Sequence, residues 1–235
     1  MKKVEVIIID DERAARSELR RMLEDYPEFS IAAEAKNADE AKMQIEQRRP
    51  EVIFLDIQMP GPSGFDLLES LVEVPEVIFT TAFDEYAVKA FEVSALDYLV
   101  KPFRAERFAL SMEKVRKRLS EKSGTGDQRR IFIKEGHHCY FLLLSSVYLI
   151  ESRENYACLF FDGKKALIKT SLTQLEEKLD ENIFFRINRT QIINTTYIQD
   201  IESLKNARIK IRLTTRDVLE VSDRQSVKFR SRSRL

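Results

Sequence analysis

The stretch VIFLDIQMPGPSG, residues 52–64, runs through four apolar residues into a single carboxylate, Asp56, and then into a loop rich in Pro, Gly and Ser. A continuous apolar run of this length is typical of a strand covered on both faces, as in a parallel sheet between helices. A carboxylate at the end of such a strand needs polar or charged partners. Asp56 is therefore the starting point for both the fold and the function.

Similar apolar runs recur through the first half of the chain. Helical patterns separate five β-type runs, at residues 4–10, 29–35, 51–56, 76–82 and 95–100. This alternation predicts an α/β doubly wound, five-stranded parallel sheet with helices on both faces, a flavodoxin-like arrangement. In such sheets the functional site lies beyond the carboxyl ends of the strands.

Polar residues stand at four of these strand ends. Asp10 and Asp11 close the first strand, Asp56 the third, Thr81 the fourth and Lys101 the fifth. Any one of these residues alone would be interpreted as a helix cap or a solvated charge. Five of them at one edge of the sheet favour a functional site. Three carboxylates without a partnering His or Cys favour Mg²⁺. A carboxylate beside Mg²⁺ and a lysine is suited to accept a phosphoryl group, so Asp56 is the predicted nucleophile.

These residues also carry a family resemblance. The segments DDE (10–12), LDIQMPGPSG (55–64), TTA (80–82) and DYLVKPF (97–103) resemble the receiver domain of bacterial two-component response regulators, over about residues 3–120. The resemblance implies that Asp56 is the phosphoacceptor. It also implies that Asp10, Asp11 and Asp56 bind Mg²⁺ with the backbone carbonyl of Gln58.

The resemblance assigns further roles near the site. Thr81 would donate a hydrogen bond to one phosphate oxygen, and Lys101 would pair with another. Tyr98 occupies the position of the family's switch aromatic, which rotates inward on phosphorylation. Pro102 would carry the family's cis peptide bond, which an X-Pro bond adopts at small cost.

Charge divides the chain into two halves. Residues 1–126 carry 19 basic and 25 acidic residues, whereas 127–235 carry 20 basic and 14 acidic residues, and the chain is neutral as a whole. The change falls in SEKSGTGDQRR (120–130), a stretch without apolar residues that is typical of a linker. We therefore expect a first domain at 1–120, a linker at 121–129 and a second domain at 130–235. The basic second half suggests a polyanionic partner.

The second half has the pattern of a mostly β domain. Short apolar runs alternate with turns, and Asp162-Gly163 predicts a tight hairpin. One helix is expected at 171–179, capped by Ser171 or Thr170. The half has no phosphate-binding glycine loop, nucleophile elbow or zinc spacing, so we expect a protein that is not an enzyme.

A second family resemblance indicates which polyanion the second half of the chain binds. The segments VYLIESRENYACL, IKTSLTQLEEKL, FFRINRTQIIN and LEVSDRQSVKF resemble the LytTR DNA-binding domain of the LytR/AlgR type, over about residues 129–232. In that family, loops enter successive major grooves of DNA. The resemblance implies base contacts from Asn155, Arg189 and Arg224, and phosphate or supporting contacts from Arg153, Lys169, Ser171 and Arg186. The chain departs from the family at Asn188, where a histidine is usual, which puts the target sequence in doubt.

Together these features predict a response regulator that a sensor histidine kinase phosphorylates on Asp56 and that binds double-stranded promoter DNA. We expect phosphorylation to favour a homodimer. The apolar seam of Phe108, Met112, Val115 and Leu119 is suited either to pairing with another helix or to covering the sheet. A stand-alone phosphoacceptor and a nucleic-acid enzyme are the alternative functions.

The remaining features place the protein in the cytoplasm of a bacterium, without a membrane partner. The apolar start of the chain is too short for a signal sequence, and no stretch reaches the length of a membrane span. Cys139 and Cys158 do not suggest a disulfide framework, and Cys158 is expected to be buried. The run His137-His138-Cys139 favours a surface turn over a metal site. The basic tail, KFRSRSRL, either touches DNA or frays.

Overall fold

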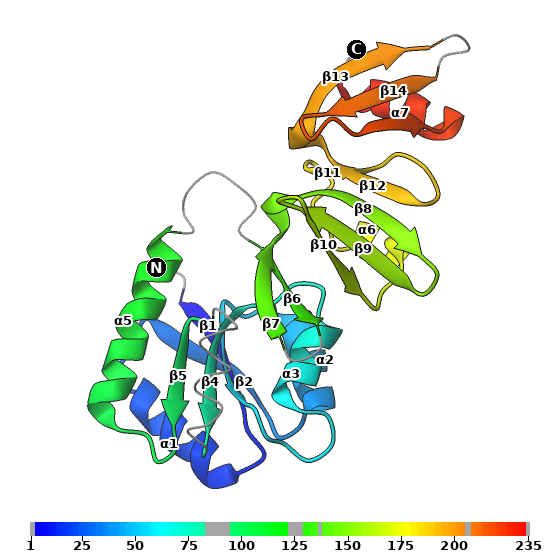
Figure 1. The fold of residues 1–235 in the computed structure, drawn as a ribbon. Coiled ribbons are helices and arrows are strands. Elements are labelled where there is room, and N and C mark those ends of the chain that lie inside the picture. Colours follow the sequence, from blue (N-terminus) through cyan, green and yellow to red (C-terminus); the bar gives the residue numbers. More distant parts are fainter. Residues whose placement is uncertain (1–2, 83–94, 122–128, 136–137, 205–207, 234–235) are drawn as a thin grey trace. The chain divides into compact units, whose positions relative to one another are not determined.

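The computed structural model describes residues 3–82, 95–121, 129–135, 138–204 and 208–233. The chain divides into two compact units, Met1–Leu143 and Leu144–Leu235 (Figure 1). Each unit is described by itself.

A five-stranded parallel sheet forms the centre of the first unit. Its order is β2-β1-β3-β4-β5, with β1 at Val4–Ile9, β2 at Phe29–Ala35, β3 at Val52–Asp56, β4 at Glu76–Thr81 and β5 at Asp97–Val100. Within the described residues four helices accompany it: α1 at Arg13–Leu23, α2 at Ala38–Arg48, α3 at Gly64–Ser70 and α5 at Ala105–Glu121. The predicted fold class is confirmed.

The two faces of the sheet explain the apolar stretch before Asp56. Successive side chains of a strand point to opposite faces. Ile53 and Leu55 therefore pack in the core with α2 and α3, whereas Val52 and Phe54 pack in the core with α1 and α5 (Figure 1). Because helices cover both faces, every position of β3 before the carboxylate is apolar.

The apolar seam of α5 covers the sheet. Phe108, Met112 and Val115 are at most 1% exposed and belong to the core shared with α1, and Leu119 packs against that core. The alternative in which this seam pairs with a second helix is therefore wrong. The exposed apolar side chain of α5 is Leu110.

A β-hairpin after α5 also belongs to the first unit. β6 (Arg130–Glu135) and β7 (His138–Leu143) pair antiparallel, and Arg130 forms an isolated bridge with Val74. Most of the predicted linker lies outside the described residues, so the predicted domain division stays a prediction.

The second unit is mostly β, as predicted. Five antiparallel strands have the order β10-β9-β8-β12-β11, and three more the order β13-β14-β15. The strands are β8 (Val147–Arg153), β9 (Tyr156–Phe161), β10 (Lys164–Ile168), β11 (Phe184–Arg186), β12 (Gln191–Asn194), β13 (Ile198–Ser203), β14 (Ile209–Leu213) and β15 (Val218–Val221). The helices are η1 (Leu144–Ser146), α6 (Leu172–Glu176), η2 (Thr195–Tyr197) and α7 (Asp223–Ser233).

Two local predictions for this unit are confirmed. Asp162 and Gly163 connect β9 to β10 with φ angles of 45° and 71°, the left-handed values of a two-residue hairpin turn. Ser171 caps α6, because its side chain accepts a hydrogen bond from the Gln174 backbone. The α6 helix is shorter than expected.

Three other elements, two strands and a helix, were not predicted. β11 and β12 went unrecognised because Phe184–Arg186 contains only three residues and shows no alternation. The tail forms helix α7, so the expectation of a single helix in this half was wrong. The apolar residues of α7 are Val227, which is exposed, and Phe229, which is buried in the core. With so few apolar residues, the sequence lacks the usual helical periodicity.

A buried carboxylate ties α5 to β5. Asp97 is 7% exposed and accepts hydrogen bonds from Arg107, from Ser111 Oγ at 2.6 Å and from Lys114 Nζ at 2.9 Å. Burial alone would raise the pKa of Asp97, but these donors outweigh it and hold the pKa below its ordinary value.

Asp97→Asn is expected to lower the free energy of unfolding by about 2 kcal/mol at pH 7, because it leaves Arg107 and Lys114 without their carboxylate. Since the pKa is lowered in the fold, this stability is present above the ordinary value of 3.8 and is lost as pH falls through the folded pKa. Urea unfolding at pH 7 and pH 3 measures both effects, with the exposed Asp25→Asn as control. Equal stability of wild type and Asp97→Asn at pH 7 would contradict the assignment.

Candidate functional site

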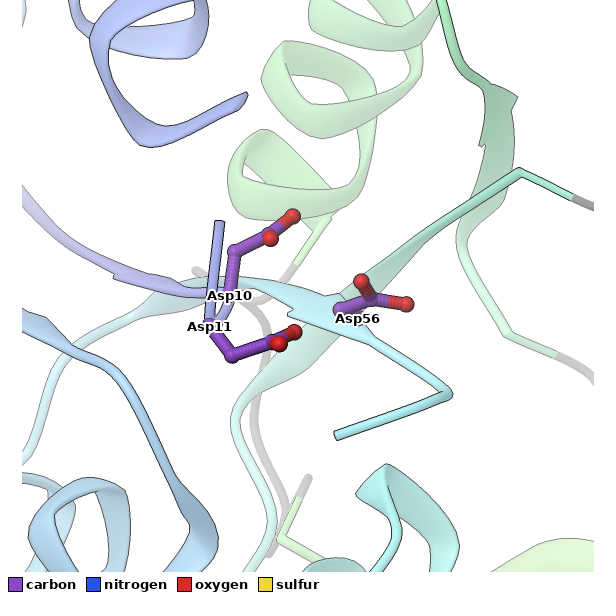
Figure 2. Close-up of side chains that lie close together, drawn as sticks. All are labelled: Asp10, Asp11 and Asp56. Carbon is purple, nitrogen blue, oxygen red and sulfur yellow. The ribbon is translucent and has the colours of Figure 1, made fainter. Parts of the chain in front are cut away.

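Three carboxylates meet at the carboxyl edge of the sheet. Asp10 and Asp11 follow β1 and Asp56 ends β3, and one ligand oxygen from each lies within 4.8 Å of the others (Figure 2). Asp10 is fully buried and Asp56 is 4% exposed, whereas Asp11 is exposed. The sequence predicts this group correctly because β1 and β3 are neighbours in the sheet.

Lys101 brings an ammonium group to these carboxylates. Its Nζ lies 2.7 Å from Asp56 Oδ2, 2.8 Å from Asp10 Oδ2 and 3.3 Å from Glu12 Oε2. The contact with Asp56 has the geometry of a hydrogen bond, and the contact with Asp10 is an ion pair without that geometry. The peptide bond between Lys101 and Pro102 is cis, as the resemblance implies.

The positive charge of Lys101 compensates the negative charges of the carboxylates only in part. Burial raises the pKa of Asp10 to about 6 and also raises the pKa of Asp56, although Lys101 opposes both shifts. Burial alone would lower the pKa of Lys101, but the two carboxylates outweigh it and raise that pKa.

The donor set fits a hard divalent cation. Within the part of the chain that the structure describes, Asp10 Oδ2 is buried and accepts no hydrogen bond. All of the candidate ligand atoms are oxygens, and a second positive charge would relieve the repulsion among the three carboxylates. The cluster can therefore accept an additional cation next to Lys101.

The loop after Asp56 is held close to the strand. Asp56 Oδ1 accepts a hydrogen bond from the Gln58 backbone at 3.0 Å, and the Gly64 backbone donates to Ile57 O at 3.0 Å. A Cβ atom on Gly64 would lie 2.4 Å from Asp56 O. The first residue of α3 is thus in direct contact with the backbone of Asp56.

Thr81 and Tyr98 lie on neighbouring strands. Thr81 is fully buried at the end of β4, and its carbonyl accepts a hydrogen bond from the Lys101 backbone at 2.8 Å. Tyr98 is 7% exposed and belongs to the core cluster that contains Phe79. Their proposed roles toward a phosphate and in a switch stay predictions.

Arg16 is a positioning residue that the sequence did not reveal. Its Nη1 donates to the carbonyl of Asp10 at 2.7 Å and to that of Asp11 at 3.2 Å, and its Nε donates to Glu34. Arg16 therefore fixes the backbone that carries two of the carboxylates. No motif could indicate this contact, because its acceptors are backbone atoms.

A second group of predicted residues lies in the second unit, on loops that backbone hydrogen bonds hold together. Ser152 at the β8–β9 turn donates to Thr190 O at 2.8 Å, and Ser222 before α7 donates to Ile187 O at 2.9 Å. The loop between β11 and β12 thus lies between the other two. Four of the predicted contact residues are exposed on or beside these loops: Arg153 at the end of β8, Asn155 in the β8–β9 turn, Arg189 between β11 and β12, and Arg224 in the first turn of α7.

Arg186 and Asn188 brace the middle loop. Arg186 donates to Glu176 Oε2 at 2.8 Å, to Asn188 O at 3.2 Å and to Arg189 O at 3.0 Å. Asn188 Oδ1 accepts hydrogen bonds from the backbone and hydroxyl of Thr190 at 2.9 and 3.0 Å. These contacts fix the backbone beside Arg189 and leave its side chain exposed.

The other predicted positions have simple environments. Lys169 is exposed after β10, and Ser171 caps α6. Cys158 is 1% exposed, as expected, and Cys139 is a partly buried cysteine on β7. His137 lies outside the described residues, so the predicted turn at this position is not described. None of the helices within the described ranges is long and apolar enough to cross a membrane.

Comparison with known families defines the class of protein. Residues 6–113 match the response regulator receiver domain, and residues 137–233 match the LytTr DNA-binding domain. The chain is therefore a response regulator with a DNA-binding domain. The receiver domain implies a histidine kinase partner, and the LytTR domain implies DNA binding.

Relatives with the same two-part organisation extend over nearly the whole chain. The sensory transduction protein LytT of Enterococcus faecalis is 33% identical over 226 residues, which cover 92% of this chain and 93% of that protein. The transcriptional regulatory protein BtsR of Salmonella typhi is 33% identical over 230 residues, covering 94% and 95%. The solved REC domain of AraT from Geobacillus stearothermophilus is 30% identical with a TM-score of 0.47, covering 53% of this chain and all of that one. The chain belongs to the LytR/AlgR-type response regulators.

Gly64→Ala tests the contact between α3 and Asp56. Alanine usually stabilises a helix relative to glycine, but here its Cβ would meet the Asp56 carbonyl. We expect the free energy of unfolding to fall by about 1–3 kcal/mol. Chemical denaturation measures it, with the exposed Gln47→Ala on α2 as a control that changes little. A stabilised Gly64→Ala would show that α3 and the Asp56 carbonyl are not in close contact.

Proposed function

We propose that Asp56 accepts a phosphoryl group from a sensor histidine kinase and that this modification controls binding of promoter DNA by the LytTR domain. The observation that carries the proposal is the position of Asp56, whose Oδ2 lies 2.7 Å from Lys101 Nζ beside two further carboxylates. An acceptor carboxylate requires cationic groups at the oxygens of the transferring phosphoryl group.

Mg²⁺ is the proposed cofactor. Asp10, Asp11, Asp56 and the backbone carbonyl of Gln58 would hold it. The buried Asp10 Oδ2 supports this assignment, because among the described residues it forms an ion pair with Lys101 but accepts no hydrogen bond. When bound, the ion would neutralise negative charge on the phosphoryl oxygens.

The residues of the chain have separate roles in the transfer. A carboxylate oxygen of Asp56 attacks the phosphorus of the phosphohistidine, the P–N bond breaks, and an acyl phosphate forms. Lys101 pairs with one phosphate oxygen, and the hydroxyl of Thr81 donates to another. Arg16 keeps the Asp10 and Asp11 backbone in place.

The readout is proposed to include self-association of the receiver. Because the core uses the apolar seam of α5, a homodimer would need another surface, and the exposed Val100 and Leu110 on β5 and α5 support one there. A change in the packing of Tyr98, which neighbours Val100 on the same strand, would alter this surface on phosphorylation.

DNA recognition is assigned to the three adjoining loops of the second unit. Asn155, Arg189 and Arg224 are the proposed base contacts, because each is exposed and Arg and Asn side chains suit the major-groove edges of guanine and adenine. Arg153, Lys169 and Ser171 are proposed phosphate contacts. Arg186 is proposed to support the loop, since its donors already bind Glu176 and loop carbonyls.

Asp56→Asn tests the acceptor. Acetyl phosphate with Mg²⁺ should add one alkali-labile phosphate to the wild type and none to the variant, because an amide does not form the acyl phosphate. The exposed Asp25→Asn should label normally. Mass spectrometry before and after mild alkali measures the stoichiometry, and full labelling of Asp56→Asn would rule out this residue.

Arg189→Ala and Arg224→Ala test base readout. Each is expected to cost about 1–3 kcal/mol on a duplex selected from random sequence, and less on a scrambled duplex. Lys165→Ala, at an exposed position of β10, should weaken binding to both duplexes alike and reduce the salt slope. The measurement is affinity for both duplexes at two salt concentrations. Equal losses on the two duplexes would assign the arginines to phosphate, and the absence of salt-dependent DNA binding would favour a phosphoacceptor that regulates a protein partner.

A further inference from the structure

The β6–β7 hairpin belongs to two parts of the protein at once. The match to the LytTr DNA-binding domain begins at residue 137 and includes β7, yet the hairpin packs within the first compact unit. Its contacts reach β4 and α3, the two elements that flank the phosphoacceptor strand and its loop.

A buried ion pair anchors the base of the hairpin. Arg130 is 8% exposed and Glu76, the first residue of β4, is fully buried, and their side chains are in direct contact. Arg118 of α5 lies 3.3 Å from the other oxygen of Glu76. The backbone of Val74 donates to Arg130 O at 3.0 Å. Because an unpaired charge at this depth is unfavourable, this end of the hairpin stays docked.

Aromatic rings continue the contact along α3. Phe132 of β6 is 1% exposed and stacks on Phe65 of α3 with ring centroids 6.1 Å apart. Phe141 of β7 meets Phe132 edge-on, and Phe65 lies 5.2 Å from Phe79 of β4. The hairpin is thus part of the core on one face of the receiver sheet.

The third contact leads directly toward Asp56. Lys134 Nζ lies 2.9 Å from Asp66 Oδ1 and 3.9 Å from Glu69 Oε2. The other oxygen of Asp66 accepts hydrogen bonds from the backbone and hydroxyl of Ser63, at 3.0 and 2.6 Å, in the capping box of α3. Ser63 and Lys134 together lower the pKa of Asp66 to about 2. One carboxylate therefore joins the loop that follows Asp56 to the hairpin.

We propose that the β6–β7 hairpin, docked on α3, is the element through which the phosphoacceptor loop and the DNA-binding domain influence each other. The inference rests on the proposed phosphorylation of Asp56. A change in the Asp56–Ser63 loop alters the position of Asp66 and so the docking of Lys134, while β7 runs directly into the second unit at Leu144. Because such coupling is reciprocal, DNA binding also changes the environment of the phosphoacceptor loop.

Lys134→Glu in the full chain tests this link without touching the core. The variant replaces attraction to Asp66 and Glu69 by repulsion, and Glu69→Lys in the same chain restores an opposite-charge pair outside the capping box. Arg21→Glu, an exposed charge reversal on α1, is the matched control. The readout is the ratio of affinities for the selected duplex with and without beryllofluoride and Mg²⁺.

In Lys134→Glu, the ratio of DNA affinities with and without beryllofluoride is expected to move toward one by about threefold. The ratio should recover in the double variant and stay unchanged in Arg21→Glu. Alkali-labile labelling of Asp56 is expected to persist in all variants. If wild type and Lys134→Glu label and respond to beryllofluoride equally, the hairpin is not the link. If the wild type does not label at all, the proposed function fails instead.

Hydrogen exchange supplies a second, independent measurement. Beryllofluoride with Mg²⁺ should change the protection of backbone amides in β6 of the wild type, and the change should shrink in Lys134→Glu. Identical protection of these amides with and without beryllofluoride, in a wild type that labels on Asp56, would overturn the inference.

Discussion

Two buried carboxylates, Asp10 and Asp56, lie against a single ammonium group, that of Lys101, at the edge where the strands of the first sheet end. Removing that ammonium would leave two negative charges uncompensated at a buried site. The free-energy cost of these unpaired charges is larger than the stabilisation that an exposed ion pair provides. The sheet order provides the compensation, because β1, β3 and β5 deliver their last residues to one edge although the chain separates them widely. The same arrangement brings three carboxylate oxygens within 4.8 Å of one another, so the residues at this edge are also those that would hold Mg²⁺ in the proposed phosphoryl transfer.

The sequence predicts this arrangement well for physical reasons. Strands covered on both faces produce uninterrupted apolar runs, and the carboxyl ends of parallel strands converge, so Asp56 and Lys101 could be placed together from the pattern alone. Arg16 could not be found in this way, since its acceptors are backbone carbonyls. The seam on α5 was ambiguous because a helix that covers a sheet and a helix that pairs with a partner have the same spacing of apolar residues. Burial of Phe108 and Met112 decides between them.

The DNA-binding loops show a second limit of sequence reasoning. Arg186 and Arg189 are three residues apart in one basic segment, and their side-chain chemistry is the same. Arg186 is held by Glu176 and by carbonyl groups of its own loop, whereas the side chain of Arg189 is exposed. An arginine that holds a loop and an arginine that reads a base differ only in what surrounds them. The helix α7 was missed for a related reason, because Phe229 is its one buried apolar residue and a lone apolar residue gives no helical periodicity.

The contacts of the β6–β7 hairpin differ in strength along its length, and this difference suits a coupling element. At the base, Arg130 and Glu76 are buried together, and separating them would strand a charge inside the protein. At the tip, Lys134 and Asp66 are 35% and 44% exposed, so their pairing is weak and reversible. A hairpin held firmly at one end and loosely at the other stays in place while its tip responds to small shifts. Asp66 belongs to the capping box that closes the loop after Asp56, so under the proposed phosphorylation of Asp56 this loop would act on the hairpin at its more weakly held end.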